Sequence, residues 1–202
     1  MRSTSNAIGL VLLAAGASSR MGTAKQLLPY QGRSLLRYMA EVALASRCSS
    51  VVVVLGAHVD RTRLEIRDLP VQTIENPHWS SGVGSSIQAG VQQITAQPLD
   101  AIIVMLCDQP LVTSANLNQL IESYQATQPS VIASAYADTL GVPALFSHQL
   151  FPDLLRLSPN EGAKHLIKQY RDRVDSISFP KGAIDLDTPE DYQRLHSNLH
   201  SL

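Results

Sequence analysis

The sequence has few cysteines and no excess of charge of either sign. Cys48 and Cys107 are the two cysteines among 202 residues, and they form no CxxC or Cys/His pattern. This argues against a thiolate zinc site and is typical of a reducing compartment such as the cytoplasm. The formal net charge is -1, so neither nucleic acid nor an acidic-tail function is expected. We expect small-molecule partners and treat both cysteines as structural.

Long apolar runs and breaks in composition are also missing. No run reaches the roughly 18 apolar residues of a membrane span, so no membrane partner is expected. We found no internal repeat, low-complexity tract or long linker that would mark a second domain. The sequence therefore predicts one domain over residues 1–202, with residues 1–6 flexible.

Short apolar runs alternate along the chain with segments of helical spacing. The stretches "IGLVLL", "VVVVLG", "AIIVMLC" and "VIASAY" are typical of strands buried on both faces. Helical spacing follows Ser34 and Gly84, and further helices are predicted over 114–126, 162–169 and 188–199, with a short strand over 71–75. This βαβ pattern predicts an α/β fold with a mostly parallel sheet, whose ligand lies at the carboxyl ends of the strands.

The loop "GASSRMGT" follows the first predicted strand at such an end. Gly16 and Gly22 allow the backbone N–H groups to converge on phosphate oxygens, and Arg20 and Lys25 add positive charge. The spacing is neither Walker A, since Thr23 occupies the lysine position, nor the Rossmann GxGxxG. An ordinary glycine-containing turn with two solvated cations remains the alternative at this point.

Carboxylates follow two later segments. Asp108 ends an apolar run and is placed to bind Mg²⁺, although a turn before Pro110 explains it equally well. Asp185 and Asp187 occupy alternate positions of one extended segment, so either could join Asp108 at a metal. Behind them, "TPED" is a capping box that begins a helix.

The segment "NPHWSSGVGSSIQAG" places polar groups between a short strand and a helix. Asn76, Gly82 and Ser86 suit ribose, base edges or phosphate, but Ser85 or Ser86 serving only as a helix cap is the competing interpretation. His58, His78, His148 and His165 show no metal-ligand spacing. No G-x-S-x-G elbow supports a serine nucleophile.

Taken in order along nearly the whole chain, six segments resemble the molybdenum-cofactor nucleotidyltransferases. They are "LAAGASSRMGTAKQLLPYQG", "NPHWSSGVGSSIQAG", "CDQPLV", "GVPALF", "NEGAKHLI" and "DLDTPEDY". The chain is most similar to the molybdopterin cytidylyltransferase branch, whose relatives carry LAAG where guanylyltransferases carry LAGG. The resemblance implies a Rossmann-like, three-layer α/β/α nucleotidyltransferase fold, in which a molybdopterin phosphate attacks the α-phosphorus of CTP and pyrophosphate leaves.

The resemblance also implies roles for particular residues. Arg20, Lys25 and Asp108 would be catalytic, and Asp108 with Asp185 would bind Mg²⁺. The nucleotide would be bound by Leu13, Ala14, Ala15, Gly16, Arg20, Lys25, Asn76, Gly82 and Ser86. CTP and molybdopterin or molybdenum cofactor would be the substrates, and a recipient molybdoenzyme or its chaperone a further partner. Where relatives read G-D-x-G-A-R this chain has Pro159 to Lys164, which leaves that segment's role at the pterin phosphate open.

Alternatives stay open on the residues alone. They include a guanylyltransferase, another phosphorylated acceptor, and a nucleotide-binding regulatory protein without turnover. The combination of Lys25 with Asp108 favours an enzyme, and the missing GxGxxG argues against an NAD oxidoreductase.

Overall fold

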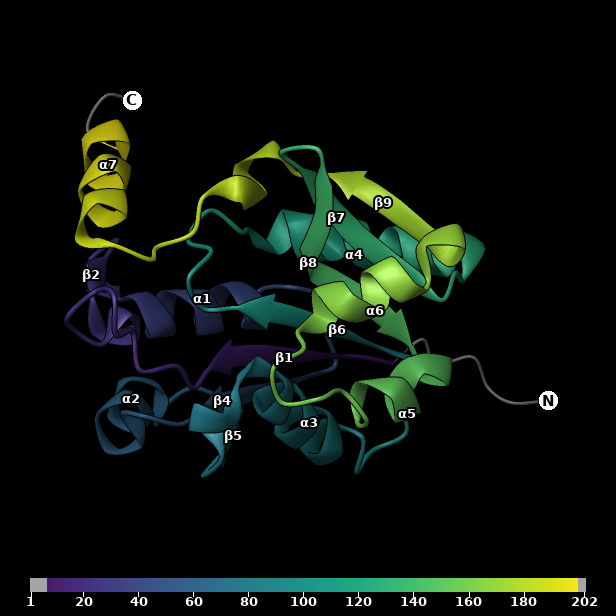
Figure 1. The fold of residues 1–202 in the computed structure, drawn as a ribbon, viewed down its shortest axis with the longest axis horizontal. Helices are drawn as coiled ribbons and strands as arrows, with labels where there is room; N and C mark the ends of the chain where they lie inside the picture. The colour runs from purple at the N-terminus through teal and green to yellow at the C-terminus, as the bar shows by residue number, and fades with distance from the viewer. Residues whose placement is uncertain (1–6, 200–202) are drawn as a thin grey trace.

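The computed structural model describes residues 7–199, so the predicted flexible segment 1–6 lies outside the described residues. Within that range a seven-stranded sheet has the order β5-β4-β1-β6-β8-β7-β9, with helices on both faces (Figure 1). The strands are β1 (Ile8–Ala14), β4 (Ser50–Leu55), β5 (Gln72–Glu75), β6 (Ala101–Leu106), β7 (Val131–Tyr136), β8 (Thr139–Ser147) and β9 (Val174–Ser178). The helices are α1 (Leu35–Leu44), α2 (Val59–Ile66), α3 (Val83–Ile94), α4 (Ser114–Thr127), α5 (Phe151–Leu154), α6 (Ala163–Gln169) and α7 (Pro189–Leu199).

The predicted mostly parallel sheet is confirmed, with β8 as the exception. Strands β5, β4, β1 and β6 pair in parallel, and β9 is parallel to β7, whereas β8 is antiparallel to both β6 and β7. The sequence did not predict β8, because Gly141 and Pro143 interrupt its apolar run. Both lie beside an irregularity in the β7–β8 ladder, where a proline is tolerated within a sheet.

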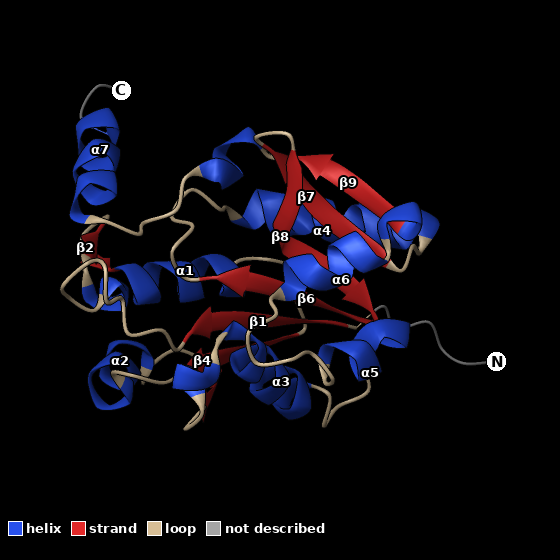
Figure 2. Cartoon of the chain, in the orientation of Figure 1, coloured by secondary structure: helices blue, strands red, loops and turns tan. Residues whose placement is uncertain are grey.

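Two apolar layers enclose the sheet. On β1, Leu10 and Leu12 pack into the layer formed with α1 and α4, while Val11 and Leu13 pack into the layer formed with α3, α5 and α6. Because successive side chains of a strand point to opposite faces, burial on both sides requires the continuous apolar runs seen in the sequence. Figure 2 shows the resulting helix, sheet, helix arrangement.

Most predicted helices are confirmed, and the helices that were missed are short or polar. Ser34 caps α1 by accepting a hydrogen bond from the Arg37 backbone N–H, 3.3 Å away. Helices α4, α6 and α7 match their predicted ranges within about one residue. Helix α2 buries only Thr62 and Ile66, so its sequence carries little apolar periodicity. No described helix is long and apolar enough to cross a membrane.

The C-terminal segment returns to the first half of the chain. Thr188 and Asp191 form the predicted capping box, in which the Thr188 N–H donates to the Asp191 carboxylate at 2.9 Å. Helix α7 then lies beside the small hairpin of β2 (Pro29–Tyr30) and β3 (Arg33–Ser34), and the Tyr192 hydroxyl donates to the Pro29 carbonyl oxygen at 2.6 Å (Figure 1). The acidic residues before α7 are thereby brought to the opening loop.

Candidate functional site

The site lies at the carboxyl ends of two adjacent parallel strands. Leu13 at the end of β1 pairs in register with Leu106 at the end of β6. The opening loop therefore begins beside the turn that carries Asp108, as the topology of a parallel sheet predicts. The Leu186 N–H donates to the Asp108 carbonyl oxygen at 2.9 Å, which places the segment before α7 on the same turn.

A glutamine that the sequence analysis missed shapes the opening loop. Gln26 is 2% exposed, and its side-chain N–H₂ donates to the carbonyl oxygens of Ala14 (2.9 Å) and Gly16 (2.7 Å). The Lys25 N–H donates to the Ser18 hydroxyl at 3.1 Å. These bonds close the loop on itself. The sequence carried no signal for Gln26, because a buried polar side chain satisfied by backbone groups has no pattern of its own.

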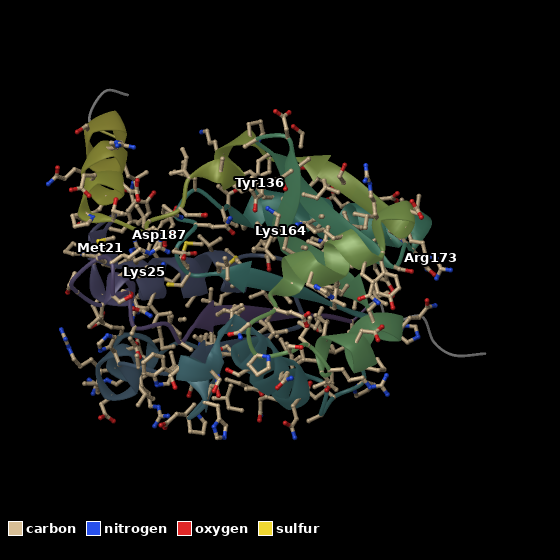
Figure 3. The ribbon with its side chains drawn as sticks, viewed as in Figure 1. Met21, Lys25, Tyr136, Lys164, Arg173 and Asp187 are labelled. Carbon is tan, nitrogen blue, oxygen red and sulfur yellow. The ribbon has the colours of Figure 1, made fainter. Side chains whose placement is uncertain are left out.

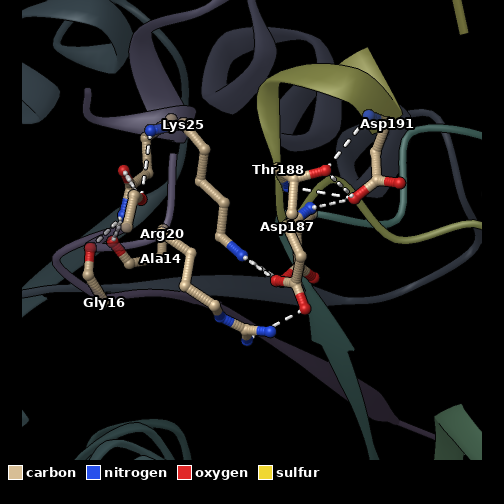
Figure 4. A network of polar contacts seen from close by, with 10 residues as sticks. Ala14, Gly16, Arg20, Lys25, Asp187, Thr188 and Asp191 are labelled. Carbon is tan, nitrogen blue, oxygen red and sulfur yellow. Dashed lines mark hydrogen bonds and ion pairs between the residues drawn. The ribbon is translucent and has the colours of Figure 1, made fainter. Parts of the chain in front are cut away.

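Two cations of the loop share carboxylates from distant segments (Figure 4). The Lys25 Nζ lies 2.5 Å from Asp108 Oδ2 and 3.2 Å from Asp187 Oδ1, and an Arg20 guanidinium nitrogen lies 3.0 Å from Asp187 Oδ2. The Lys25 side chain is 17% exposed and that of Arg20 is 72% exposed. Lys25 is thus held inside the site, while Arg20 reaches it from solvent.

The charge of Lys25 is maintained despite its enclosure. Burial alone would lower the pKa of Lys25, but the carboxylates of Asp108 and Asp187 outweigh that effect and raise it. The second oxygen of Asp108, Oδ1, is buried and has no hydrogen-bond partner among the described residues. A buried carboxylate oxygen without a donor is costly unless a cation or donor arrives with the ligand.

Asp185 and Asp187 occupy different surroundings, although the sequence placed them on one face. Asp187 contacts Arg20 and Lys25, whereas Asp185 belongs with Gln109 and Tyr136. Partial desolvation of its carboxyl, followed by repulsion from Asp108, raises the pKa of Asp185 to about 6. A carboxyl that is disfavoured as an anion beside a second carboxylate is suited to a cation between them.

The donor set fits a hard divalent cation that would take its other ligands from water and phosphate. Within residues 7–199, no group of three or more His, Cys, Asp or Glu side chains is arranged to hold a metal by itself. Mg²⁺ and Mn²⁺ bind to one or two carboxylates together with substrate phosphates. Asp108 and a neighbouring aspartate can supply the carboxylates.

A cavity of 210 Å³ lies between the loop and the start of α3. Predicted site residues on its wall are Leu13, Ala14, Ala15, Gly16, Lys25, Gly82, Ser86 and Asp108. Two predicted nucleotide-binding residues are not on that wall. Arg20 extends to Asp187, and buried Asn76 donates to the Ser85 and Ser86 hydroxyls at 2.9 and 3.0 Å. Asn76 therefore fixes the serines from behind, and neither serine caps α3, whose first flanking residue is Gly82.

The start of α3 is pressed against the loop of residues 158–162. The Gly84 N–H donates to the Pro159 carbonyl oxygen at 2.8 Å, and a Cβ at Gly84 would lie 2.2 Å from the Ser158 carbonyl oxygen. Gly82 has φ of 128° and faces the same loop. Both positions accordingly require glycine.

A second cavity of 290 Å³ lies beside the first, and Leu13, Val83 and Leu106 line both. Its polar lining residues are Gln109, Tyr136, Lys164 and Asp185. Tyr136 and Lys164 come from β7 and α6 and lie close to each other, while Lys25 and Asp187 lie together nearer α7 (Figure 3). Lys164 belongs to the "NEGAKHLI" segment, so the structure places that segment at this cavity. A wider hollow of 740 Å³ beyond Tyr136 contains neither the opening loop nor Asp108.

The cysteines do not offer a nucleophile. Cys107 is 3% exposed, and burial raises the pKa of its thiol, with the Asp108 charge adding to the effect. Burial likewise raises the pKa of Cys48 to about 11. Because the thiolate is the reactive form, neither thiol is suited to covalent catalysis.

Comparison with known proteins agrees with this geometry. Residues 10–174 match the MobA-like NTP transferase domain family. Nicotine blue oxidoreductase of Paenarthrobacter nicotinovorans is 36% identical over 92% of this chain and 94% of its own length. The purine catabolism protein PucB of Bacillus subtilis is 31% identical over 90% of this chain and 92% of its own length.

The crystal structure of Rv0371c from Mycobacterium tuberculosis has a TM-score of 0.84 and 30% identity, covering 96% of this chain and 100% of that one. A manganese complex of Rv0371c has a TM-score of 0.77 and 28% identity, covering 94% of this chain and 97% of that one.

The fold and the charged loop at the strand ends define a nucleotidyltransferase. The chain belongs to the MobA-like NTP transferase family, which confirms the resemblance to the molybdenum-cofactor nucleotidyltransferases drawn from the six motifs.

Proposed function

We propose that this protein transfers CMP from CTP to the terminal phosphate of molybdopterin, releasing pyrophosphate. The observation that carries the proposal is the Lys25 ammonium lying between Asp108 and Asp187 at the mouth of the 210 Å³ cavity. Two cations of the loop meet carboxylates from two distant segments there, so a triphosphate would find positive partners and a divalent cation would find carboxylate ligands at one place. The LAAG sequence of residues 13–16 supports CTP over GTP.

The loop would align and neutralise the triphosphate. Transfer at phosphorus depends on positioning and on stabilising charge rather than on a protein nucleophile, and the buried thiols agree with that requirement. Lys25 would exchange its carboxylate partners for phosphate oxygens, and Arg20, already exposed, would fold onto the departing pyrophosphate.

Asp108 and Asp185 would hold the metal, for which we propose Mg²⁺. Such a cation withdraws charge from the phosphorus under attack when bound. Asp108 contributes its unpartnered Oδ1, and Asp185 contributes a carboxyl already poised to exchange a proton for a cation. A Mn²⁺ site in Rv0371c supports a divalent ion of this kind.

The 290 Å³ cavity would receive the acceptor. It shares walls with the nucleotide cavity, so a phosphate entering from it arrives beside the bound triphosphate. Relatives carry arginine, the last residue of G-D-x-G-A-R, at the position of Lys164. Lys164 supplies positive charge at this cavity in its place, which supports a role for residues 159–164 at the acceptor phosphate.

Purified protein incubated with each of the four NTPs, Mg²⁺ and molybdopterin tests the proposal by pyrophosphate release and product mass. CTP should give the highest kcat/KM. The value for GTP should be lower by a factor that corresponds to about 1 to 3 kcal/mol less stabilisation of the transition state. Replacing Ala15 by glycine should narrow that difference if the methyl group helps exclude the larger base. Ala15 also packs against Gly56, so the stability of the variant is measured in parallel.

Other outcomes separate the alternatives. Preference for GTP would replace the cytidylyl assignment with a guanylyl one, and turnover only with a different phosphorylated acceptor would replace molybdopterin. Binding of CTP without turnover under any condition would favour a regulatory protein. NAD(P)H oxidation by the protein in place of pyrophosphate release would align it with its oxidoreductase-named relative.

A further inference from the structure

The second cavity contains a buried amide that the protein leaves half satisfied. Gln109 is 2% exposed, and its side-chain Nε2 donates to the Gly182 carbonyl oxygen at 3.1 Å. Its Oε1 is buried and has no hydrogen-bond partner among the described residues. A buried acceptor without a hydrogen bond destabilises the fold, so such a group is suited to a donor that arrives with a ligand.

The orientation of this amide is fixed by its surroundings. Because Nε2 is engaged with Gly182, the free oxygen can only accept. Next to it, Tyr136 is confined between two glycines, since a Cβ at Gly141 would lie 2.1 Å from the Tyr136 hydroxyl and a Cβ at Gly182 would lie 2.6 Å from its ring. Tyr136 is thereby held beside the Gln109 amide, whose N–H₂ rather than its Oε1 faces the hydroxyl.

The neighbouring polar groups do not supply the missing donor. The Tyr136 hydroxyl donates to the Val142 carbonyl oxygen at 3.2 Å, and Asp185 offers acceptor oxygens when ionised. Lys164 lines the same cavity, and its ammonium group is suited to an anion. The donor that Oε1 lacks must therefore come from outside the chain.

The other lining residues and the volume of the cavity indicate which class of ligand would carry that donor. Besides its polar residues, the cavity is lined by the apolar side chains of Leu13, Val83, Ile87, Val104 and Leu106. A volume of 290 Å³ is near the lower end of the range for small-molecule sites, which is large enough for the heterocyclic ring of the proposed acceptor. A planar ring with an N–H can be recognised by apolar side chains that pack on its faces and by one buried acceptor that binds the N–H at its edge.

We propose that Gln109 determines acceptor specificity, its Oε1 accepting a hydrogen bond from a ring N–H of a planar heterocyclic acceptor while Lys164 binds the phosphate of that acceptor. The inference rests on the proposed function for the placement of the acceptor. It adds Gln109 as the residue that recognises the acceptor and a ring N–H as the group that is recognised. Because Oε1 is already shielded from bulk water, the bond is made without displacing strongly competing solvent.

The test compares Gln109→Met with a matched control, Gln88→Met. Gln88 also donates its side-chain amide to a backbone carbonyl, that of Leu157 at 2.6 Å, but does not line either cavity. We expect Gln109→Met to lower kcat/KM for molybdopterin at least tenfold with KM for CTP unchanged, and Gln88→Met to change neither. Equal kinetics in Gln109→Met and wild type would overturn the proposal.

A second arm changes the ligand, and its decisive comparison uses wild-type protein alone. Binding of 6-hydroxymethylpterin to wild-type protein is measured by pterin fluorescence, beside an analogue methylated at the ring nitrogen N3. We expect the methylated probe to bind at least tenfold more weakly to wild type, and this difference to vanish in Gln109→Met. Equal binding of the two probes to wild type overturns the inference.

This arm also separates the two proposals. Discrimination between the probes without nucleotidyl transfer to molybdopterin would contradict the proposed function and leave the role of Gln109 supported. Transfer to molybdopterin without discrimination would do the reverse.

Discussion

The cations at the site differ in how deeply they are held, and the difference sets what each substitution should do. Lys25 is enclosed between two carboxylates, whereas most of the Arg20 side chain is in solvent. Exposed ion pairs contribute about 0 to 1 kcal/mol, but removal of an enclosed partner leaves a carboxylate without compensation.

We predict that Lys25→Ala and Arg20→Ala each lower kcat/KM by about 10² to 10³ fold, because each loses charge that stabilises the transition state. Urea denaturation should separate them. Lys25→Ala should lower the free energy of unfolding by about 1 to 3 kcal/mol, and Arg20→Ala by less than about 0.5 kcal/mol. Full activity in Arg20→Ala would remove that residue from the site.

The two aspartates before α7 should also respond differently. Asp185→Asn should raise the Mg²⁺ concentration for half-maximal activity at least tenfold, whereas Asp187→Asn should raise KM for CTP because Arg20 and Lys25 lose their shared partner. The reverse result would assign the metal to Asp187. Asp108→Asn, measured alongside, should nearly abolish turnover.

The pH dependence of Mg²⁺ affinity provides an independent test of Asp185 as a ligand. The metal-free pKa of Asp185 is raised to about 6, so a proton competes with the cation below that pH. Mg²⁺ affinity should therefore fall as the pH drops through 6, and this dependence should weaken in Asp185→Asn. An unchanged profile would argue that Asp185 is not a ligand.

At the scale of elements, the start of α3 packs closely against the backbone of residues 158–162. We predict that Gly84→Ala lowers the free energy of unfolding by about 1 to 3 kcal/mol, because its Cβ would overlap the Ser158 carbonyl oxygen. Gly162→Ala is the control, since its nearest neighbour would be Val83 at an ordinary 3.4 Å. Equal stability of both variants in urea would show that the loop yields readily.

The elements also show what a sequence can predict here. Strands β1, β4 and β6 were predictable because burial on both faces demands continuous apolar residues, and α7 because Thr188 and Asp191 form a capping box. Strand β8 was not, since its interrupted apolar run hides a strand whose irregularity absorbs Pro143. Gln26 and Gln109 were missed for another reason: their roles depend on backbone carbonyls brought close only by the fold.

At the scale of the whole molecule, the two cavities meet at the centre of one sheet edge. Leu13, Val83 and Leu106 line both, so the donor and the acceptor would lie against the same apolar side chains. The motifs predicted which segments converge there. Which of two nearby aspartates faces the loop and which faces the second cavity is decided by the path of the chain between Gly182 and α7.

The contact between Lys25 and Asp187 joins positions separated by 162 residues. During synthesis the opening loop is among the first segments made, and the carboxylate that Arg20 and Lys25 share comes near the end of the described chain. Contacts so distant in sequence form late, after the intervening loop-closure entropy has been overcome. A nascent chain that has not yet reached Asp187 therefore carries its two loop cations without that counter-charge, exposed to any polyphosphate in the surrounding solution.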